Sequence, residues 1–272
     1  MNMIKVKIAS CIATAAVVLS SCGGVPTEGG TEEASAPKVC SVEEVLTMVA
    51  MENNVTRTTY TKRIVGGLKK QGLKFDEDWR DDEVEAGPLP ALFLRGISAS
   101  IRKSDVPLGL YLGSDFPINA SNKFEGKQAE LFQKIKATKE PEFFYEEDVK
   151  LHTAMFADVA KAAPCVSCHN DHPQTSKKDW KLDDVMGATT WQYPSDSLTY
   201  EEAKAVITAY RNGATDIYNE MIAEIEAFKT SEKPEIGDKW PSEGFYLPTA
   251  EVFLDSVSKM IDTEKTLKTF QL

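Results

Sequence analysis

Two cysteines and a histidine stand close together in the run Cys165-Val166-Ser167-Cys168-His169. Thiols three positions apart can each form a thioether with a vinyl group on one edge of a porphyrin, and the adjacent imidazole can then bind the iron. The spacing therefore predicts one covalent haem c, held by Cys165 and Cys168, with His169 as the proximal iron ligand. Such a haem would make the protein an electron carrier, a sensor of redox state or small ligands, or less often a haem enzyme.

Two other kinds of site share part of this pattern. A zinc site needs further nitrogen or sulfur ligands, and after Cys168 only His169 and His172 follow, three residues apart on what we expect to be one helical turn. A thioredoxin-like dithiol belongs between a strand and a helix of a βαβ unit, and the surrounding sequence shows no such unit. The motif therefore favours haem over either alternative.

The first residues predict export. Residues 1–21 carry Lys5 and Lys7 before an apolar stretch that is too short to span a bilayer comfortably, as in a secretory signal peptide. The run Leu19-Ser20-Ser21-Cys22 resembles a bacterial lipobox, which implies cleavage before Cys22 and lipid attachment to its thiol. Residues 22–40 then form a flexible tether, since most are Gly, Pro, Glu, Ser and Thr. A Gly directly after Cys22 fits sorting to the outer membrane, so we expect a lipid anchor that faces the periplasm.

The net charge narrows the kinds of partner that the protein can bind, and the cysteine count shows which thiol is left unassigned. The chain has 31 basic and 42 acidic residues, a formal charge of −11. A surface this acidic excludes a nucleic-acid partner and would attract a basic redox partner protein. Of the five cysteines, Cys11 leaves with the signal segment, and lipid and haem account for three others. Cys40 is left as an unpaired thiol in an oxidising compartment.

Periodic apolar positions predict the elements that hold the motif. Ser41 and Glu44 form a capping-box pattern at the start of a helix that runs to about Lys70. Two further helices are predicted over 91–101 and 123–136. The predicted strands are 108–112, 143–145, 149–156 and 185–193. Short strands with helices between and around them indicate an α/β or α+β domain with one antiparallel sheet, which we place at 41–194.

After Pro194 the pattern becomes helical, and we place a helical C-terminal extension at 195–272. Thr199 and Glu202 make a second capping box, and a long amphipathic helix follows it, with Gly213 as a weak point. Its apolar face either packs back on the domain or forms a surface for a partner or a homodimer. One more helix is predicted over 249–260.

The middle of the chain resembles a bacterial family of exported single-haem c-type domains with a PAS-like fold, also found in sensor kinases and chemoreceptors. The likeness covers about 54–194. The segments that carry it are Arg57 to Thr61, Gly87 to Ala91, Ser114 to Glu125, Cys165 to Pro173, and Asp179 to Gly187. The family usually has Pro at Ala120 and Gly at Asp183. The resemblance implies a five-stranded antiparallel sheet flanked by helices, with the haem against it.

The second axial ligand of the iron decides between electron transfer and ligand binding. The resemblance favours Cys40 as this second ligand, because a related family member uses a cysteine from its N-terminal helix region to bind the iron. The alternative is that Cys40 only packs on Val45. Other candidates are Met155 or another methionine such as Met48 or Met51, His152, His172, and water or an empty position. Lys177 and Lys178 either pair with haem propionates or are solvated loop charges.

The sequence favours a lipid-anchored, extracytoplasmic mono-haem c-type protein for electron transfer or redox sensing. The alternative is a haem-based gas or redox sensor module that signals through a partner protein. No set of paired carboxylates or nucleophile and base can be placed in a site, so we do not expect an enzyme, with weak peroxidase-like activity at an open haem left as an alternative.

Overall fold

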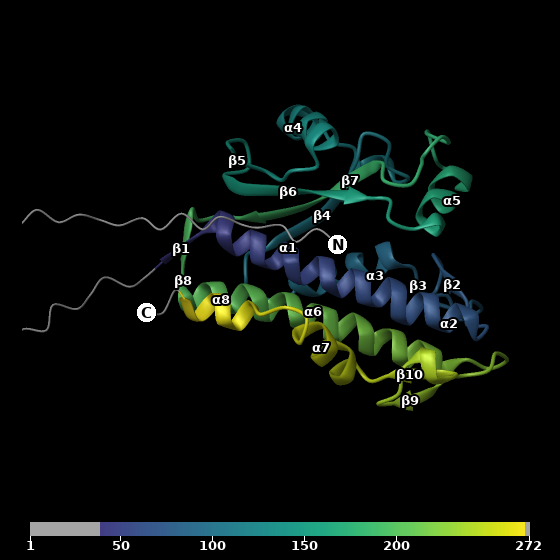
Figure 1. Ribbon diagram of the computed structural model, residues 1–272. Helices are drawn as coiled ribbons and strands as arrows, with labels where there is room; N and C mark the ends of the chain where they lie inside the picture. The colour runs from purple at the N-terminus through teal and green to yellow at the C-terminus, as the bar shows by residue number, and fades with distance from the viewer. Residues whose placement is uncertain (1–38, 270–272) are drawn as a thin grey trace, which may run out of the picture. The chain divides into compact units, whose positions relative to one another are not determined.

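The computed structural model describes residues 39–269, so the predictions for the signal segment, for Cys22 and for most of the tether lie outside the described residues (Figure 1). The described helices are α1 (Val42–Thr59), the π-helix η1 (Tyr60–Val65), α2 (Gly66–Lys70), α3 (Pro90–Ile101), η2 (Ala120–Asn122), α4 (Gly126–Thr138), α5 (Ala163–Asp171), α6 (Tyr200–Ala227), η3 (Pro241–Glu243), α7 (Ala250–Ser258) and α8 (Thr263–Thr269). The described strands are β1 (Val39–Ser41), β2 (Phe75–Asp76), β3 (Gly87–Pro88), β4 (Gly109–Gly113), β5 (Glu142–Glu146), β6 (Leu151–Val159), β7 (Val185–Tyr193), β8 (Ser197–Thr199), β9 (Glu235–Gly237) and β10 (Tyr246–Pro248). None of the helices in this range is both long and apolar enough to cross a bilayer.

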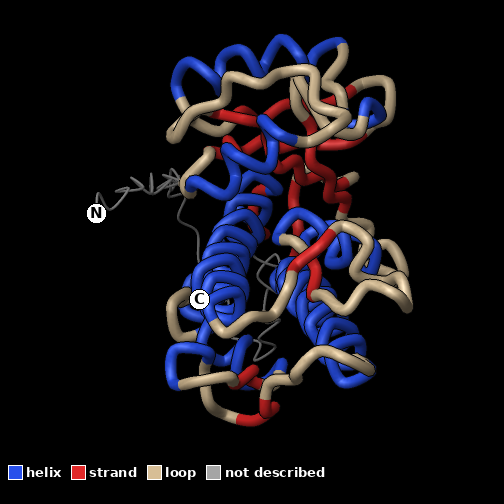
Figure 2. Tube along the Cα trace, turned by 90° about the vertical axis from the view of Figure 1, so that its right-hand side faces the viewer, coloured by secondary structure: helices blue, strands red, loops and turns tan. Residues whose placement is uncertain are grey.

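The main sheet has the strand order β4-β7-β6-β5, and every neighbouring pair is antiparallel. Helix α4 covers one face of this sheet, and α1 lies against the other face (Figure 1). The turned view shows the same layers, with the strands between α4 and the long helices (Figure 2). The predicted α+β class, with an antiparallel sheet flanked by helices, is confirmed.

The number of strands differs from what the resemblance implied. Among the described residues the main sheet has four strands, so the expectation of five is wrong here. After β4 the chain makes only a single bridge, between Ser114 and Lys123, and then turns through η2. Pro117 lies in this segment and has no backbone N–H to offer a strand ladder, so no hairpin partner forms on β4.

The first helical stretch begins where the sequence predicts. The Ser41 hydroxyl accepts from the Glu44 backbone N–H, and the Glu44 carboxylate accepts from the Ser41 backbone N–H at 2.9 Å. The stretch continues through α1, η1 and α2 to Lys70, so the helix predicted over 41–70 is confirmed, with one π-helical segment inside it. A π-helical turn inside a longer helix is often found at functional sites.

Helix α6 packs on α3 and α1 and shares one hydrophobic core with them. Gly213 permits this close approach, because a Cβ at that position would lie 3.0 Å from the carbonyl oxygen of Ile97. The glycine that weakens an isolated helix is therefore used at a helix–helix contact. Of the two predicted uses of the apolar face of α6, the structure shows packing back on the domain. The helix predicted over 249–260 is present as α7, capped by Thr249.

Candidate functional site

Helix α5 presents the cysteine and histidine motif. Pro164 lies in its first turn, where a missing N–H has no consequence. Cys165, Cys168 and His169 are three and four residues apart, so they share one face of the helix. The thiols of Cys165 and Cys168 are free, Cys165 is half-buried and Cys168 is exposed. None of the residues of α5 is fully buried, so the chain leaves this face partly open.

A small apolar cluster attaches α5 to the end of the sheet. Ala160, Trp180 and Met186 are buried together, and Cys165 and Val166 pack against them. The Asn170 side chain joins the helix to the following loop, since it accepts from the Trp180 backbone N–H at 2.9 Å and donates to the Trp180 carbonyl at 3.1 Å. Two contacts on one side therefore fix the helix and leave the motif accessible.

Charged side chains from three other elements surround the motif. Arg57 of α1 pairs with Asp158, which lies near the end of β6, five residues before α5 begins. Glu77, directly after β2, lies 3.2 Å from the Nε2 atom of His172 at the end of α5. These segments are far apart in the sequence and meet only in the folded chain.

The environment favours the neutral forms of His169 and Cys168. Burial lowers the pKa of His169, although Asp158 acts in the other direction, and a neutral imidazole is the form that binds iron. Burial, followed by Glu77, raises the pKa of the Cys168 thiol. Redox-active dithiols have lowered pKa values instead, and α5 connects antiparallel strands rather than parallel ones. Both observations disfavour a thioredoxin-like dithiol.

The zinc alternative is also weak. Both ring nitrogens of His172 already have partners, because Nε2 meets Glu77 and Nδ1 accepts from the Gln174 backbone N–H at 3.1 Å. Within residues 39–269, no group of three or more His, Cys, Asp and Glu side chains is arranged to hold a metal ion. His172 makes the hydrogen bonds of a structural residue and lies on the same helix end as His169.

Cys40 lies in a different part of the molecule. It is 0% exposed, pairs across β1 with Leu198 of β8, and belongs to the main core. Arg57, which approaches the motif, lies about 22 Å further along the helix that starts at Val42, given a rise of about 1.5 Å per residue. Burial, with Glu44 as the second cause, raises the pKa of the Cys40 thiol to about 11. The structure does not bring Cys40 to His169, so this arrangement does not support it as the second iron ligand.

The strand candidates are also held elsewhere. Met155 is fully buried beneath α4 with Phe124 and Phe132. The ring of His152 packs against Tyr145 at the opposite end of β6 from α5, with centroids 4.8 Å apart. On α1, Met48 is buried in the main core and Met51 is exposed. Met155, His152 and Met48 are thus each held in another environment, and Met51 is exposed.

Of the two lysines after the motif, one makes contacts within the protein and the other is exposed. Lys177 forms an ion pair with Asp179, and its ammonium lies 4.6 Å from the centre of the Trp180 ring. Lys178 is exposed. The sequence analysis missed Arg57 and Asp158 as neighbours of the motif. A charged residue at the end of a predicted strand, close before the motif, was the only local signal for Asp158.

Asp183 stands where the resembling family usually has Gly, and the backbone conformation explains why Asp is tolerated there. This residue has φ 69°, in the left-handed region that glycine enters without cost and Asp tolerates better than most residues. Its carboxylate accepts from Lys161 at 2.6 Å. Asp183 therefore keeps the turn for which the family more often has glycine, and the turn stands next to α5 without changing it.

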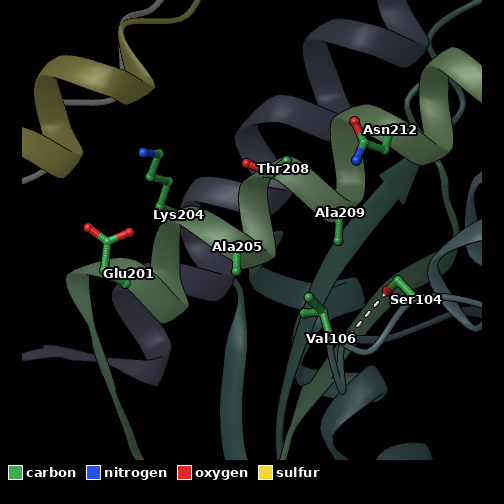
Figure 3. A pocket seen from close by; sticks show the side chains of 8 residues that line it. All are labelled: Ser104, Val106, Glu201, Lys204, Ala205, Thr208, Ala209 and Asn212. Atoms are coloured by element: carbon green, nitrogen blue, oxygen red, sulfur yellow. Dashed lines mark hydrogen bonds between the residues drawn. The ribbon is translucent and has the colours of Figure 1, made fainter.

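The larger of the two most prominent hollows on the described surface lies away from α5. It has a volume of about 340 Å³ and lies between the start of α6 and the loop after α3 (Figure 3). Its lining residues are Ser104, Val106, Glu201, Lys204, Ala205, Thr208, Ala209 and Asn212. No thiol or imidazole lines it, so it adds nothing to the chemistry of the motif.

The residues at α5 fit a covalently held haem. Two free thiols and an imidazole share one helix face that is only partly covered, as thioether attachment and proximal ligation require. The buried Nε1 atom of Trp180, next to Cys165, has no hydrogen-bond partner among the described residues. A buried donor without a partner beside the motif is consistent with a polar group of a bound cofactor.

Comparison with known proteins gives one match. A family model described as Tll0287-like: Tll0287 matches residues 40–194, which is more than half of the chain. No curated protein and no solved structure matches. The matched range contains the main sheet, α1 and the whole of α5.

Proposed function

The chain belongs to the Tll0287-like family of cytochrome c-like domains with a PAS-like fold, and on that premise we propose that it is a mono-haem c-type protein for electron transfer or redox sensing. Cys165 and Cys168 hold the haem through thioethers, and His169 is the proximal ligand. The observation that carries the proposal is α5, where these three groups share one helix face that the rest of the chain covers only in part. When bound, the haem supplies an iron that can gain or lose one electron.

The location is part of the same proposal. The signal segment and Cys22 place the protein outside the cytoplasm, anchored by lipid to the outer membrane and facing the periplasm. Haem c is attached outside the cytoplasm in bacteria, so export and the motif support one another. The acidic surface suits a basic redox partner protein.

One observation favours the alternative function, a haem-based sensor of gas or redox state that signals through a partner. Cys40, Met155, His152 and His172 are each held in another environment. A haem without a strong second protein ligand has a position open to oxygen, nitric oxide or carbon monoxide. Carbon monoxide binding to the reduced protein separates the two functions, because tight binding supports sensing and its absence supports electron transfer.

The test of haem attachment is production of the chain in a cell competent for cytochrome maturation. We expect a mass increase of one haem and a Soret band that survive denaturation. The double variant Cys165→Ala/Cys168→Ala loses both, and Cys40→Ser, the matched control with an unrelated thiol, keeps both. Wild-type protein without the added mass and without the band would overturn the proposal.

A further inference from the structure

A partly buried ion pair lies between α1 and the sheet. The Nη2 atom of Arg57 donates to both carboxylate oxygens of Asp158, at 3.1 and 3.3 Å, and Nη1 donates to the Thr189 hydroxyl at 3.4 Å. The side chain of Arg57 is 23% exposed and that of Asp158 is 32% exposed. Two residues 101 positions apart therefore form one fixed pair of opposite charges.

The pair is placed next to the haem-bearing helix by a bulge in the sheet. Asp158 faces Gly187 in the ladder, and the register shifts directly after it, so that Val159 faces Val185. Ala160 follows and packs with Cys165 in the cluster that holds α5. On the other side, α1 gives way to the π-helix η1 three residues after Arg57. A bulge and a π-helical turn, both common near functional sites, lie next to this pair on its two elements.

Stability alone is a weak reason for such a pair. Removing two charges from water costs free energy that their attraction often fails to recover, and an apolar pair of similar size frequently stabilises a protein as well or better. Burial opposes the charge of Arg57, yet Asp158 raises the pKa of the guanidinium above its ordinary value, so the cation is permanent. Arg57 interacts electrostatically with Cys165, and Asp158 with His169, and solvent screens such partly buried charges less than exposed ones.

We propose that Arg57 and Asp158 are positioning residues that together set the reduction potential of the haem on α5, with Arg57 raising it and Asp158 lowering it. The inference rests on the proposed function. Reduction adds one electron to the haem iron, supplied by a redox partner protein in the cell and by dithionite in a titration. A nearby cation stabilises the form that has gained the electron, and a nearby anion stabilises the form that has lost it.

The experiment is a potentiometric titration of the full-length, haem-loaded protein and its variants at neutral pH. Arg57→Gln should lower the equilibrium constant for reduction by about tenfold, a shift of about 59 mV for one electron, and Asp158→Asn should raise it. Arg57→Lys should restore most of the wild-type potential, because it keeps the cation. The matched control is Lys161→Gln, which removes an exposed pair with Asp183 just before α5 and should shift the potential little.

Two further measurements distinguish an effect on the reduction potential from a purely structural role and from a failure of haem attachment. Thermal unfolding of each variant detects a purely structural role, which lowers stability without opposite shifts in potential. Intact mass reports haem attachment, and loss of haem in the wild type would remove the proposed function itself. With haem attached, the inference is overturned if Arg57→Gln and Asp158→Asn shift the potential in the same direction, or by no more than Lys161→Gln does.

Discussion

The cysteine at the start of the first helical stretch and the two cysteines on α5 differ in how far they are buried. Cys40 is 0% exposed and belongs to the main core. Arg57, near the end of α1, acts electrostatically on Cys165 of α5, a helix that has no buried residue and that also carries Cys168. The three cysteines are the same residue type, so only their surroundings distinguish a structural thiol from a reactive one. A buried thiol serves packing, while a thiol on a partly open helix face is available to form a bond.

The main core depends on dense aromatic packing, which the surroundings of α5 lack. Tyr60 stacks on Phe93 with centroids 4.1 Å apart, and Tyr218 stacks on Phe253 at 4.5 Å. These rings belong to four segments, η1, α3, α6 and α7, and hold them together. The described contacts of α5 include the small cluster around Trp180, the Asn170 hydrogen bonds and the pair of His172 with Glu77. We therefore expect the core to determine stability and α5 to determine chemistry.

The largest expected effect is on the core. Phe93→Ala should lower the free energy of unfolding by about 3–5 kcal/mol, because a fully buried ring leaves a cavity among three aromatic neighbours. The matched change on α5, Val166→Ala, should cost about 0.5 kcal/mol or less in protein without haem, since Val166 is only partly buried. Urea denaturation followed by circular dichroism measures both. Equal losses of unfolding free energy in the two variants would contradict the expectation that the core determines stability.

The next effect concerns Cys40 itself. Cys40→Ser should lower the free energy of unfolding by about 1–3 kcal/mol, because it buries a hydroxyl in an apolar core. Haem content, absorption and electron paramagnetic resonance spectra should stay as in the wild type. Cys40→Ala, which adds no polar group, should cost less than the serine change. A changed low-spin spectrum in the serine variant would instead make Cys40 an iron ligand and contradict the arrangement described here.

The smallest effect is a dependence of stability on pH. The pKa of Cys40 is raised to about 11 in the folded chain, from an ordinary value of 9.0, chiefly by burial. The folded chain therefore holds this proton more tightly than the unfolded chain does. The stabilisation is fully present below pH 9 and is lost as the pH rises toward 11. Denaturation of wild type and Cys40→Ala between pH 8 and pH 11 should show a steeper loss in the wild type, because buried tyrosines with raised pKa values, such as Tyr60 and Tyr218, contribute a loss in both proteins. Parallel curves would contradict the role of Cys40.

Local sequence signals predicted the helices and three of the four main strands well. Both capping boxes, at Ser41 and Thr199, are present, and β7 has the predicted bounds. Strand β6 begins two residues later and ends three residues later than predicted, because its end is set by pairing with β7 at the bulge. A fifth strand did not form, since whether an edge strand pairs depends on the segment that must lie beside β4.

The cysteine and histidine motif was fixed by short-range spacing, because residues three and four apart on one helix share a face in any fold that keeps the helix. The sequence therefore determined the family, the fold class and the haem-attachment residues that we propose. Only the tertiary structure separated Cys40 from His169 and brought Arg57 to Asp158 beside α5, since both depend on segments far apart in the chain. Burial and long-range pairing are properties of the packed molecule, and no local pattern of residues contains them.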